Sequence, residues 1–245
     1  MMPILLELEG YPIYSYPFFL GISWILAYKL IKKALLEKNH PLNGFKVLFF
    51  TGSIFVWIGA KLFFLIHSPL NDWRIIGKLS FWLGGGTVFY GGFLFAVIFL
   101  VVYCIFLKKF DFFKTHLFIP AICFSHAIGR FGCFLSGCCY GKYCKLPWAV
   151  SLNGISRHPV QLYEAVSVLV IGLATKKLIK INIRPLSVIC FYFVGYATIR
   201  FILEFFRGDG IRGIYAMQLS AAQYFSIGLI LATTVIVISC RKKYL

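Results

Sequence analysis

The stretch LSVICFYFVGYATIRFILEFF, residues 186–206, decides the fold of this chain. Its length matches the roughly 20 predominantly apolar residues that an α-helix needs to cross the hydrocarbon of a bilayer. Two ionisable residues, Arg200 and Glu204, interrupt the apolar run four positions apart. Residues at that spacing share one face of a helix. The stretch therefore predicts a membrane-spanning helix that carries a polar group on one face.

The composition extends this prediction to the whole chain. Of its 245 residues, 60% are hydrophobic and only 13% are charged, whereas soluble domains usually carry about 25% charged residues. We therefore expect one all-α, multi-pass membrane domain over residues 1–245, with seven spans. The predicted spans, of which the fourth and fifth carry polar residues and glycine, are 13–31, 46–66, 82–106, 116–135, 159–175, 186–206 and 217–240.

The distribution of basic residues predicts how the spans are oriented. The net charge of +17 could indicate nucleic-acid binding, but the basic residues gather in short clusters between apolar segments, so no nucleic-acid partner is expected. Fifteen of the 25 Lys and Arg residues fall on one side of a seven-span arrangement, seven on the other and three within spans. The positive-inside rule then places the N-terminus outside and the C-terminus in the cytoplasm. Residues 1–10 have no basic region, so a cleavable signal peptide is not expected.

Four ionisable residues inside the predicted spans indicate a site: Arg130, Glu164, Arg200 and Glu204. Each such group costs about 2.5–3.5 kcal/mol at bilayer depth, so it usually marks function or a paired contact. One interpretation is that Arg200 and Glu204 only neutralise each other. The other is that Arg200 binds an anionic lipid headgroup and Glu204 orients it, because a guanidinium fork suits phosphate oxygens. Lys61 also lies in a span and is expected to extend towards an interface.

Two glycine-rich stretches near the outer surface also attract attention. Glycine lets backbones approach closely and exposes amides to a ligand, but tight helix packing is an alternative explanation. For the second stretch we favour a binding site, because Arg130 lies inside it. The stretches comprise Gly84, Gly85, Gly86, Tyr90, Gly91 and Gly92, and then Gly129, Gly132, Gly137 and Gly141.

Four of the eight cysteines cluster within twelve positions on the predicted outer side, namely Cys133, Cys138, Cys139 and Cys144. Three hypotheses stay open: a disulfide or buried thiols, a metal site, or a thiol made reactive by a nearby cation. The spacing fits no common zinc pattern, and no metal ligand is expected. His158 follows an outer loop and is the histidine best placed for acid–base chemistry; a capping role is an alternative. The cysteines expected to be small core residues are Cys104, Cys123, Cys190 and Cys240.

Three sequence blocks resemble those of the prolipoprotein diacylglyceryl transferase family, in the family's order. Residues 129–134, GRFGCF, resemble its signature loop, together with the glycines that follow. Residues 157–164, RHPVQLYE, are similar to a second family block, and residues 200–207, RFILEFFR, to a third. The resemblance covers most of the chain. Further residues that fit in order and spacing are Gly91, Gly92, Gln223 and Ser226.

The resemblance implies a seven-span enzyme of the bacterial plasma membrane. Such an enzyme transfers a diacylglyceryl group from phosphatidylglycerol to the lipobox cysteine thiol of a preprolipoprotein and releases glycerol phosphate. Its partners would be phosphatidylglycerol, the signal peptides of preprolipoproteins and membrane lipids; no cofactor is expected. The candidate catalytic residues are Arg130, Arg200, Glu204, Tyr90 and His158. The candidate substrate-binding residues are Gly91, Gly92, Gly129, Gln161, Tyr163, Glu164, Cys133 and Cys138.

The chain departs from the family pattern at two places. Tyr90 stands where the family usually has a His before the paired glycines, and a Tyr, with an ordinary pKa near 10, is a poor proton acceptor. Cys133, Ser136 and Cys138 stand where the signature usually has two Asn and a Glu. The acceptor therefore stays open between a lipobox cysteine and a glycan or another lipid. Two further alternatives are a membrane thiol oxidoreductase and a non-catalytic lipid-binding protein. The oxidoreductase is disfavoured because the chain has no Cys-x-x-Cys pair.

Overall fold

Helices make up most of the computed structural model, as the apolar segments predict. The longer helices are α1 Ser15–Glu37, α2 Asn43–His67, α4 Phe89–Val101, α5 Ile119–Ser136, α6 Val160–Lys180, α7 Pro185–Leu203 and α8 Ala221–Lys242. Shorter turns extend α4 (π, Val102–Phe106), precede α5 (3-10, Phe112–Phe118), continue α7 (3-10, Glu204–Phe206) and precede α8 (3-10, Ala216–Gln218). The structure describes residues 2–8, 11–67, 76–78, 81–82, 89–209 and 214–242.

Every predicted span overlaps one of these helices, although the start of the third predicted span, 83–88, lies outside the described residues. Among the described residues, four helical stretches are long and apolar enough to cross a membrane: Asn43–Ile66, Phe112–Ser136, Pro185–Phe206 and Ala221–Ser239. A fifth, Gly91–Phe106, is apolar but shorter. The chain is thus mostly helical, with several helices that are long and apolar enough to cross a membrane, and the number seven stays a prediction.

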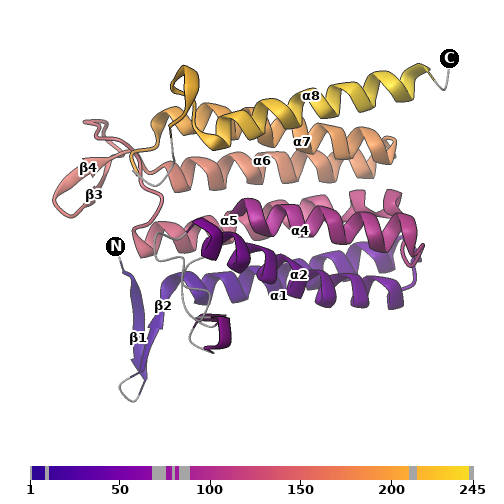
Figure 1. Ribbon diagram of the computed structural model, residues 1–245, viewed down its shortest axis with the longest axis horizontal. Coiled ribbons are helices and arrows are strands. Elements are labelled where there is room, and N and C mark those ends of the chain that lie inside the picture. Colours follow the sequence, from indigo (N-terminus) through magenta and orange to yellow (C-terminus); the bar gives the residue numbers. More distant parts are fainter. Residues whose placement is uncertain are drawn as a thin grey trace. The chain divides into compact units, whose positions relative to one another are not determined.

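The helices belong to two compact units. One comprises Met1–Ala34 together with His116–Leu245, and the other comprises Leu35–Thr115. In the first unit, α5 packs against α6, α6 against α7 and α7 against α8 (Figure 1). Proline at the start of α7 suits the first helical turn, where a backbone N–H has no helical partner. In the second unit, α2 packs against α4.

Two small antiparallel hairpins accompany the helices, and the sequence analysis did not predict them. Strand β1, Ile4–Leu8, pairs with β2, Tyr11–Tyr14, and strand β3, Val150–Leu152, pairs with β4, Ile155–Arg157. The turn between β3 and β4 is Asn153-Gly154, and both residues have positive φ angles of 52° and 76°. Asn-Gly is the pair that favours such a two-residue turn, so this hairpin has a local sequence signal.

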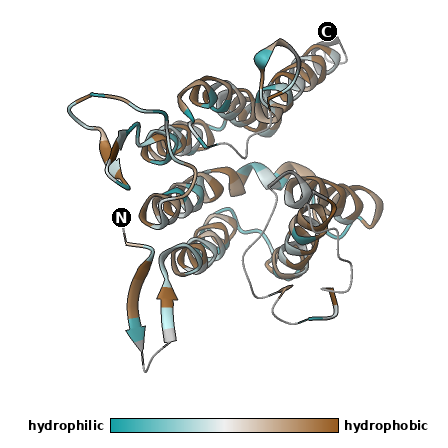
Figure 2. Cartoon of the chain, turned by 60° about the vertical axis from the view of Figure 1, so that its left-hand side comes forward, coloured by the Kyte–Doolittle hydropathy of each residue, from teal (hydrophilic) through white to brown (hydrophobic). Residues whose placement is uncertain are grey.

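Polar and apolar side chains are distributed as expected for a protein dissolved in lipid. On α6, Val166, Val170 and Leu173 are about 60% exposed, while Glu164 and Thr175 are buried. Brown, hydrophobic positions predominate along the helices in Figure 2. Apolar side chains facing outward and polar side chains facing inward are favourable only where the surroundings are apolar.

Lys61 is buried inside the chain, and its extension towards an interface stays a prediction. Its side chain is 1% exposed and is buried, and the Nζ atom donates a hydrogen bond of 2.6 Å to the backbone oxygen of Phe81. The ammonium group also lies 5.0 Å from the centroid of the Phe81 ring. A carbonyl oxygen and an aromatic face together stabilise the buried cation.

Candidate functional site

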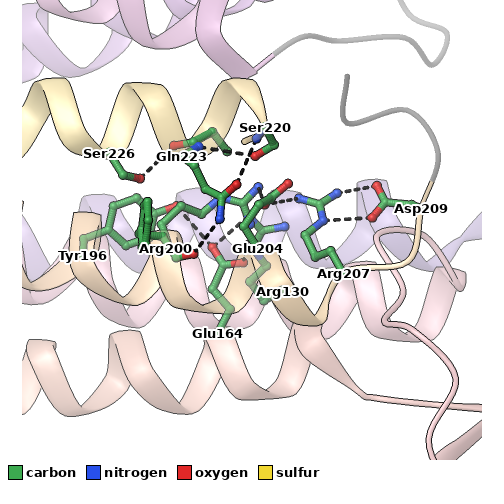
Figure 3. Close-up of polar contacts among 12 residues, drawn as sticks. Arg130, Glu164, Tyr196, Arg200, Glu204, Arg207, Asp209, Ser220, Gln223 and Ser226 are labelled. Carbon is green, nitrogen blue, oxygen red and sulfur yellow. Dashed lines mark hydrogen bonds and ion pairs between the residues drawn. The ribbon is translucent and has the colours of Figure 1, made fainter. Parts of the chain in front are cut away.

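The buried carboxylate of Glu164 is the centre of a polar cluster formed by α5, α6 and α7 (Figure 3). Its Oε1 atom accepts a hydrogen bond of 2.9 Å from an NH2 group of Arg130 and one of 3.1 Å from the hydroxyl of Tyr196. His126 lies 3.3 Å from the same oxygen and also accepts a hydrogen bond from Arg130 Nε. Glu164 therefore joins three helices through a single charged group.

Arg200 approaches the other oxygen of this carboxylate. Its NH1 group lies 3.7 Å from Glu164 Oε2, while its NH2 group lies 2.8 Å from Glu204 Oε2. The predicted pair Arg200–Glu204 is thus present, and Arg200 also meets Arg130 across Glu164. Within the described part of the chain, the buried NH1 group of Arg200 has no hydrogen-bond partner. A buried donor of this kind is able to bind an anionic oxygen of a ligand.

A third arginine continues the chain of charges past the end of α7. Arg207 NH1 lies 3.9 Å from Glu204 Oε2, and the guanidinium donates two hydrogen bonds to the carboxylate of Asp209. Burial alone would lower the pKa of Arg207, but hydrogen bonding to Asp209 and the charge of that carboxylate raise it above its ordinary value. The arginine is therefore permanently charged. Together, three arginines and three carboxylates alternate along this cluster.

The first turn of α8 supports the C-terminal half of the cluster. Gln223 accepts a hydrogen bond of 2.9 Å from the backbone N–H of Ser220, and its amide donates one of 3.4 Å to the backbone oxygen of Phe201. Phe201 directly follows Arg200 in α7. Gln223 therefore fixes α8 against the turn of α7 that carries the arginine (Figure 3).

The loop after α5 lies against both α6 and the end of α7. Gln161, on the first turn of α6, donates a hydrogen bond of 2.6 Å to the backbone oxygen of Cys138. Gly208 N–H donates to the backbone oxygen of Tyr140, at 3.0 Å. A Cβ at Gly208 would stand 2.6 Å from the backbone oxygen of Gly141, so only glycine permits this approach. The loop that carries Cys138 is thus held beside the charged cluster.

His158 and Tyr163 belong to a neighbouring aromatic group. The Tyr163 hydroxyl lies 3.3 Å from His158 Nδ1 and accepts a hydrogen bond of 2.7 Å from Trp148 Nε1. The His158 ring also packs edge-on against Phe206, with centroids 5.4 Å apart. In the described chain these are the side-chain partners of His158, so no contact links its imidazole to Glu164. Its catalytic role stays a prediction.

The candidate glycines fall into two groups. A Cβ at Gly91 would stand 2.3 Å from the backbone oxygen of Gly59, and one at Gly92 would stand 3.2 Å from that of Val56. Both residues therefore allow α4 to pack closely on α2. In contrast, among the described residues, no heavy atom beyond its own stretch of helix lies within 4 Å of the position that a Cβ of Gly129 would occupy. The side chain of the candidate Tyr90 and all of residues 83–88 lie outside what the structure describes.

Four members of the cluster were not predicted as site residues. One of them, Arg207, is the last residue of the third sequence block that resembles the family. Tyr196 lies four residues before Arg200 and therefore on the same helix face, which was a usable signal. His126 lies four residues before Arg130 in the same way, which was also a usable signal. Asp209 lies outside the predicted span, and nothing in the local sequence indicates that it folds back onto Arg207.

Comparison with known proteins gives a consistent result over almost the full length. A family model described as prolipoprotein diacylglyceryl transferase matches residues 3–239. Several bacteria have proteins named phosphatidylglycerol–prolipoprotein diacylglyceryl transferase that are similar to this chain. One from Finegoldia magna is 30% identical, covering 91% of this chain and 87% of its own length. One from Clostridium tetani is 31% identical, covering 93% of each. One from Geobacter sulfurreducens is 30% identical, covering 91% and 89%.

Proposed function

We infer the function from one premise: this chain belongs to the prolipoprotein diacylglyceryl transferase family. It transfers a diacylglyceryl group from phosphatidylglycerol to a prolipoprotein. The acceptor atom is the thiol sulfur of the lipobox cysteine. The observation that supports this function at the level of the site is the convergence of Arg130 and Arg200 on the two oxygens of Glu164. Two guanidinium groups in one buried place suit the phosphodiester of a lipid.

The proposed reaction is a displacement at carbon. The thiol of the acceptor releases its proton to water, and its sulfur attacks the glyceryl carbon that bears the phosphate ester. The C–S bond forms while the C–O bond breaks, and the electron pair of that bond leaves on an oxygen of glycerol phosphate. Arg130 and Arg200 stabilise the charge that develops on this leaving group. Glu164 positions both guanidinium groups before the lipid arrives.

Each of the other candidate residues has a separate role in this scheme. Glu204 orients Arg200 through its 2.8 Å contact, and Gln161 holds the loop of Cys138 beside the lipid. The open space beside Gly129 gives the lipid headgroup access to the arginine that follows it in α5. Tyr90 and His158 stay candidates for orienting the acceptor, and Gly91 and Gly92 stay candidates for lipid contact.

The same proposal places the chain in the bacterial plasma membrane with seven spans. The apolar stretches that could cross a membrane and the exposed valines of α6 support a lipid environment. The excess of Lys and Arg on one side of the seven-span arrangement supports an N-terminus outside and a C-terminus in the cytoplasm. Phosphatidylglycerol then reaches the arginines from the bilayer itself.

The test uses the purified chain in phosphatidylglycerol vesicles that carry a label in the diacylglyceryl group. A lipobox peptide is added, and both peptide labelling and release of glycerol phosphate are measured. Arg130→Ala and Arg200→Ala are each expected to lower the rate about 100-fold or more, because a group that stabilises the leaving charge is lost. Arg184→Ala is the matched control, since Arg184 is an exposed arginine just before α7.

The outcomes separate the candidate functions. Peptide labelling that depends on Arg130 and Arg200 but not on Arg184 supports the proposed transfer. Release of glycerol phosphate without labelled peptide would instead indicate the same chemistry with another acceptor, such as a glycan or a lipid. Full activity of Arg130→Ala would show that this arginine does not stabilise the leaving group.

A further inference from the structure

Three free thiols meet at the C-terminal end of α5. The Sγ atoms of Cys133, Cys138 and Cys139 all lie within 4.8 Å of one another. Cys133 is buried, Cys139 is intermediate and Cys138 is exposed. The fourth cysteine of the sequence cluster, Cys144, is buried elsewhere on the loop, where its backbone N–H donates to Ser156. The trio therefore forms a distinct group with one open side.

The backbone is bent in a way that brings the three thiols together. Gly137 adopts a left-handed conformation, with φ of 73°, and ends α5. The N–H of Cys138 then donates to the oxygen of Cys133, and that of Gly137 donates to the oxygen of Phe134, which is the Schellman pattern. Cys139 also has a positive φ of 57°, which residues with a Cβ adopt rarely. A non-glycine residue is held in this conformation only where its surroundings require it.

The trio lies next to the charged cluster of the site. Cys133 is three residues after Arg130 in α5 and therefore shares its helix face. The loop of Cys138 is fixed by Gln161 of α6, and the following residues are fixed by the end of α7. Arg130 is thus a cation on the helix face that carries Cys133, and a cation nearby offsets part of the negative charge that three thiolates would bring to this place.

Three cysteine sulfur atoms this close together form a donor set for a thiophilic metal ion. Zinc is held tetrahedrally by sulfur ligands, and a zinc ion that takes part in a reaction keeps its fourth position free. Zinc also has no redox chemistry of its own, so it does not oxidise thiols. The exposed side of Cys138 supplies the access that an exchangeable fourth ligand needs.

We propose that Cys133, Cys138 and Cys139 bind a zinc ion whose fourth position takes the thiol of the acceptor cysteine. This inference rests on the proposed transferase function and adds to it the group that activates the acceptor. A thiol that coordinates zinc loses its proton, which passes to water, and stays a nucleophile. Its sulfur then forms the C–S bond as described above, and the C–O electron pair leaves with glycerol phosphate. The zinc ion is unchanged at the end.

The first experiment measures metal binding without reference to activity. The full chain is produced in zinc-supplemented cells and purified, and its zinc content is measured by mass spectrometry. We expect about one zinc per chain, and a decrease of about tenfold in Cys133→Ser, Cys138→Ser and Cys139→Ser. Cys144→Ser, which alters a loop cysteine outside the trio, is the matched control and should retain the metal. Helical circular dichroism checks that each variant is folded.

The second experiment tests the fourth position. Cobalt(II) is exchanged for zinc, so that sulfur-to-metal charge-transfer bands and the visible bands report the ligands. A lipobox peptide with cysteine should change these bands, whereas the same peptide with serine in its place should not. Bands that do not respond to the cysteine peptide would overturn the role of the acceptor thiol. Wild-type protein without zinc, or a disulfide between any two of the trio, would overturn the metal site.

The transfer assay then separates this inference from the proposed function. If transfer stops when zinc is chelated and returns when zinc is restored, the inference is supported. If chelated protein transfers lipid at the full rate, the zinc proposal is wrong while the transferase function stands. If zinc-loaded protein binds the cysteine peptide but never transfers lipid, the transferase function is wrong while the metal site stands.

Discussion

At the scale of single residues, the position of Glu164 between two arginines explains why charged groups are tolerated here. A lone ion in an apolar interior is unstable, and a buried ion pair is stable only with good geometry and further hydrogen bonds. Glu164 meets this requirement, since Arg130, Tyr196 and Arg200 approach its two oxygens. The lipid phosphate would meet guanidinium groups whose orientation is already fixed, which lowers the cost of ordering the site during the reaction.

Replacing Glu164 by Gln tests this positioning role. The substitution keeps the shape and removes the charge, which leaves Arg130 and Arg200 buried without their common counter-ion. Breaking a buried pair in this way costs about 3–5 kcal/mol, and we expect the melting temperature in detergent to fall by on the order of 10 °C. Glu7→Gln, on the exposed face of β1, should leave the melting temperature unchanged. If Glu164→Gln melts like the wild type and transfers lipid at the normal rate, Glu164 has no positioning role.

At the scale of elements, the close approach of α4 to α2 depends on glycine. A Cβ at Gly91 would stand 2.3 Å from the oxygen of Gly59 and 2.5 Å from Cβ of Phe63, and neither atom can move far in a packed pair of helices. At Gly21 in α1, the described part of the chain places no heavy atom from beyond the local helix within 4 Å of the corresponding position. The two glycines therefore offer matched sites at which the same substitution has opposite consequences.

We predict that Gly91→Ala destabilises the protein by about 1–3 kcal/mol through overpacking. Gly21→Ala should instead be neutral or should stabilise it by up to about 1 kcal/mol, because alanine favours the helix. Thermal unfolding of both variants in detergent measures the difference, and the transfer assay is run beside it. A Gly91→Ala variant with unchanged melting temperature but a raised KM for phosphatidylglycerol would show that Gly91 contacts the lipid rather than the neighbouring helix.

The helices were predictable because one physical quantity, the length of an apolar run, determines where a chain can cross lipid. The short elements were harder because their signals are local and weak. The β3–β4 hairpin follows from the pair Asn153-Gly154 alone. The turn at Gly137 that brings the cysteines together was not predicted, because the usual zinc spacings assume ligands on a hairpin or a helix. Here a left-handed turn brings residues five and six positions apart in the chain beside Cys133.

At the scale of the whole molecule, the sequence identified Arg130, Glu164 and Arg200 but not that Glu164 lies between the two arginines. Arg130, Glu164 and Arg200 were predicted as functional residues inside separate spans. That all three meet depends on how α5, α6 and α7 pack, and a single sequence carries no direct information on helix neighbours. The rule that residues four positions apart share a helix face applies only within one helix. It therefore predicted the pair Arg200–Glu204 and not the contacts between helices.

The orientation of the chain in the membrane can be tested with two asparagines that have nearly the same local structure. Asn153 lies in the β3–β4 turn and Asn182 in the turn between α6 and α7, and both are exposed with positive φ angles of 52° and 56°. In the seven-span arrangement, Asn153 lies outside the cell and Asn182 in the cytoplasm, where Lys176, Lys177 and Lys180 are nearby in the sequence.

A short epitope inserted after each asparagine should therefore behave differently in intact spheroplasts. Antibody is expected to bind the epitope at Asn153 without permeabilisation, and the epitope at Asn182 only after the membrane is opened. Because both insertions fall in exposed turns of the same kind, a difference reports the membrane side rather than local access. Equal binding at both sites in intact spheroplasts would require an even number of crossings between them and would rule out α6 as a single span. Binding at Asn153 only after the membrane is opened would instead remove the outer location on which the proposed access of a prolipoprotein cysteine to the thiols of α5 depends.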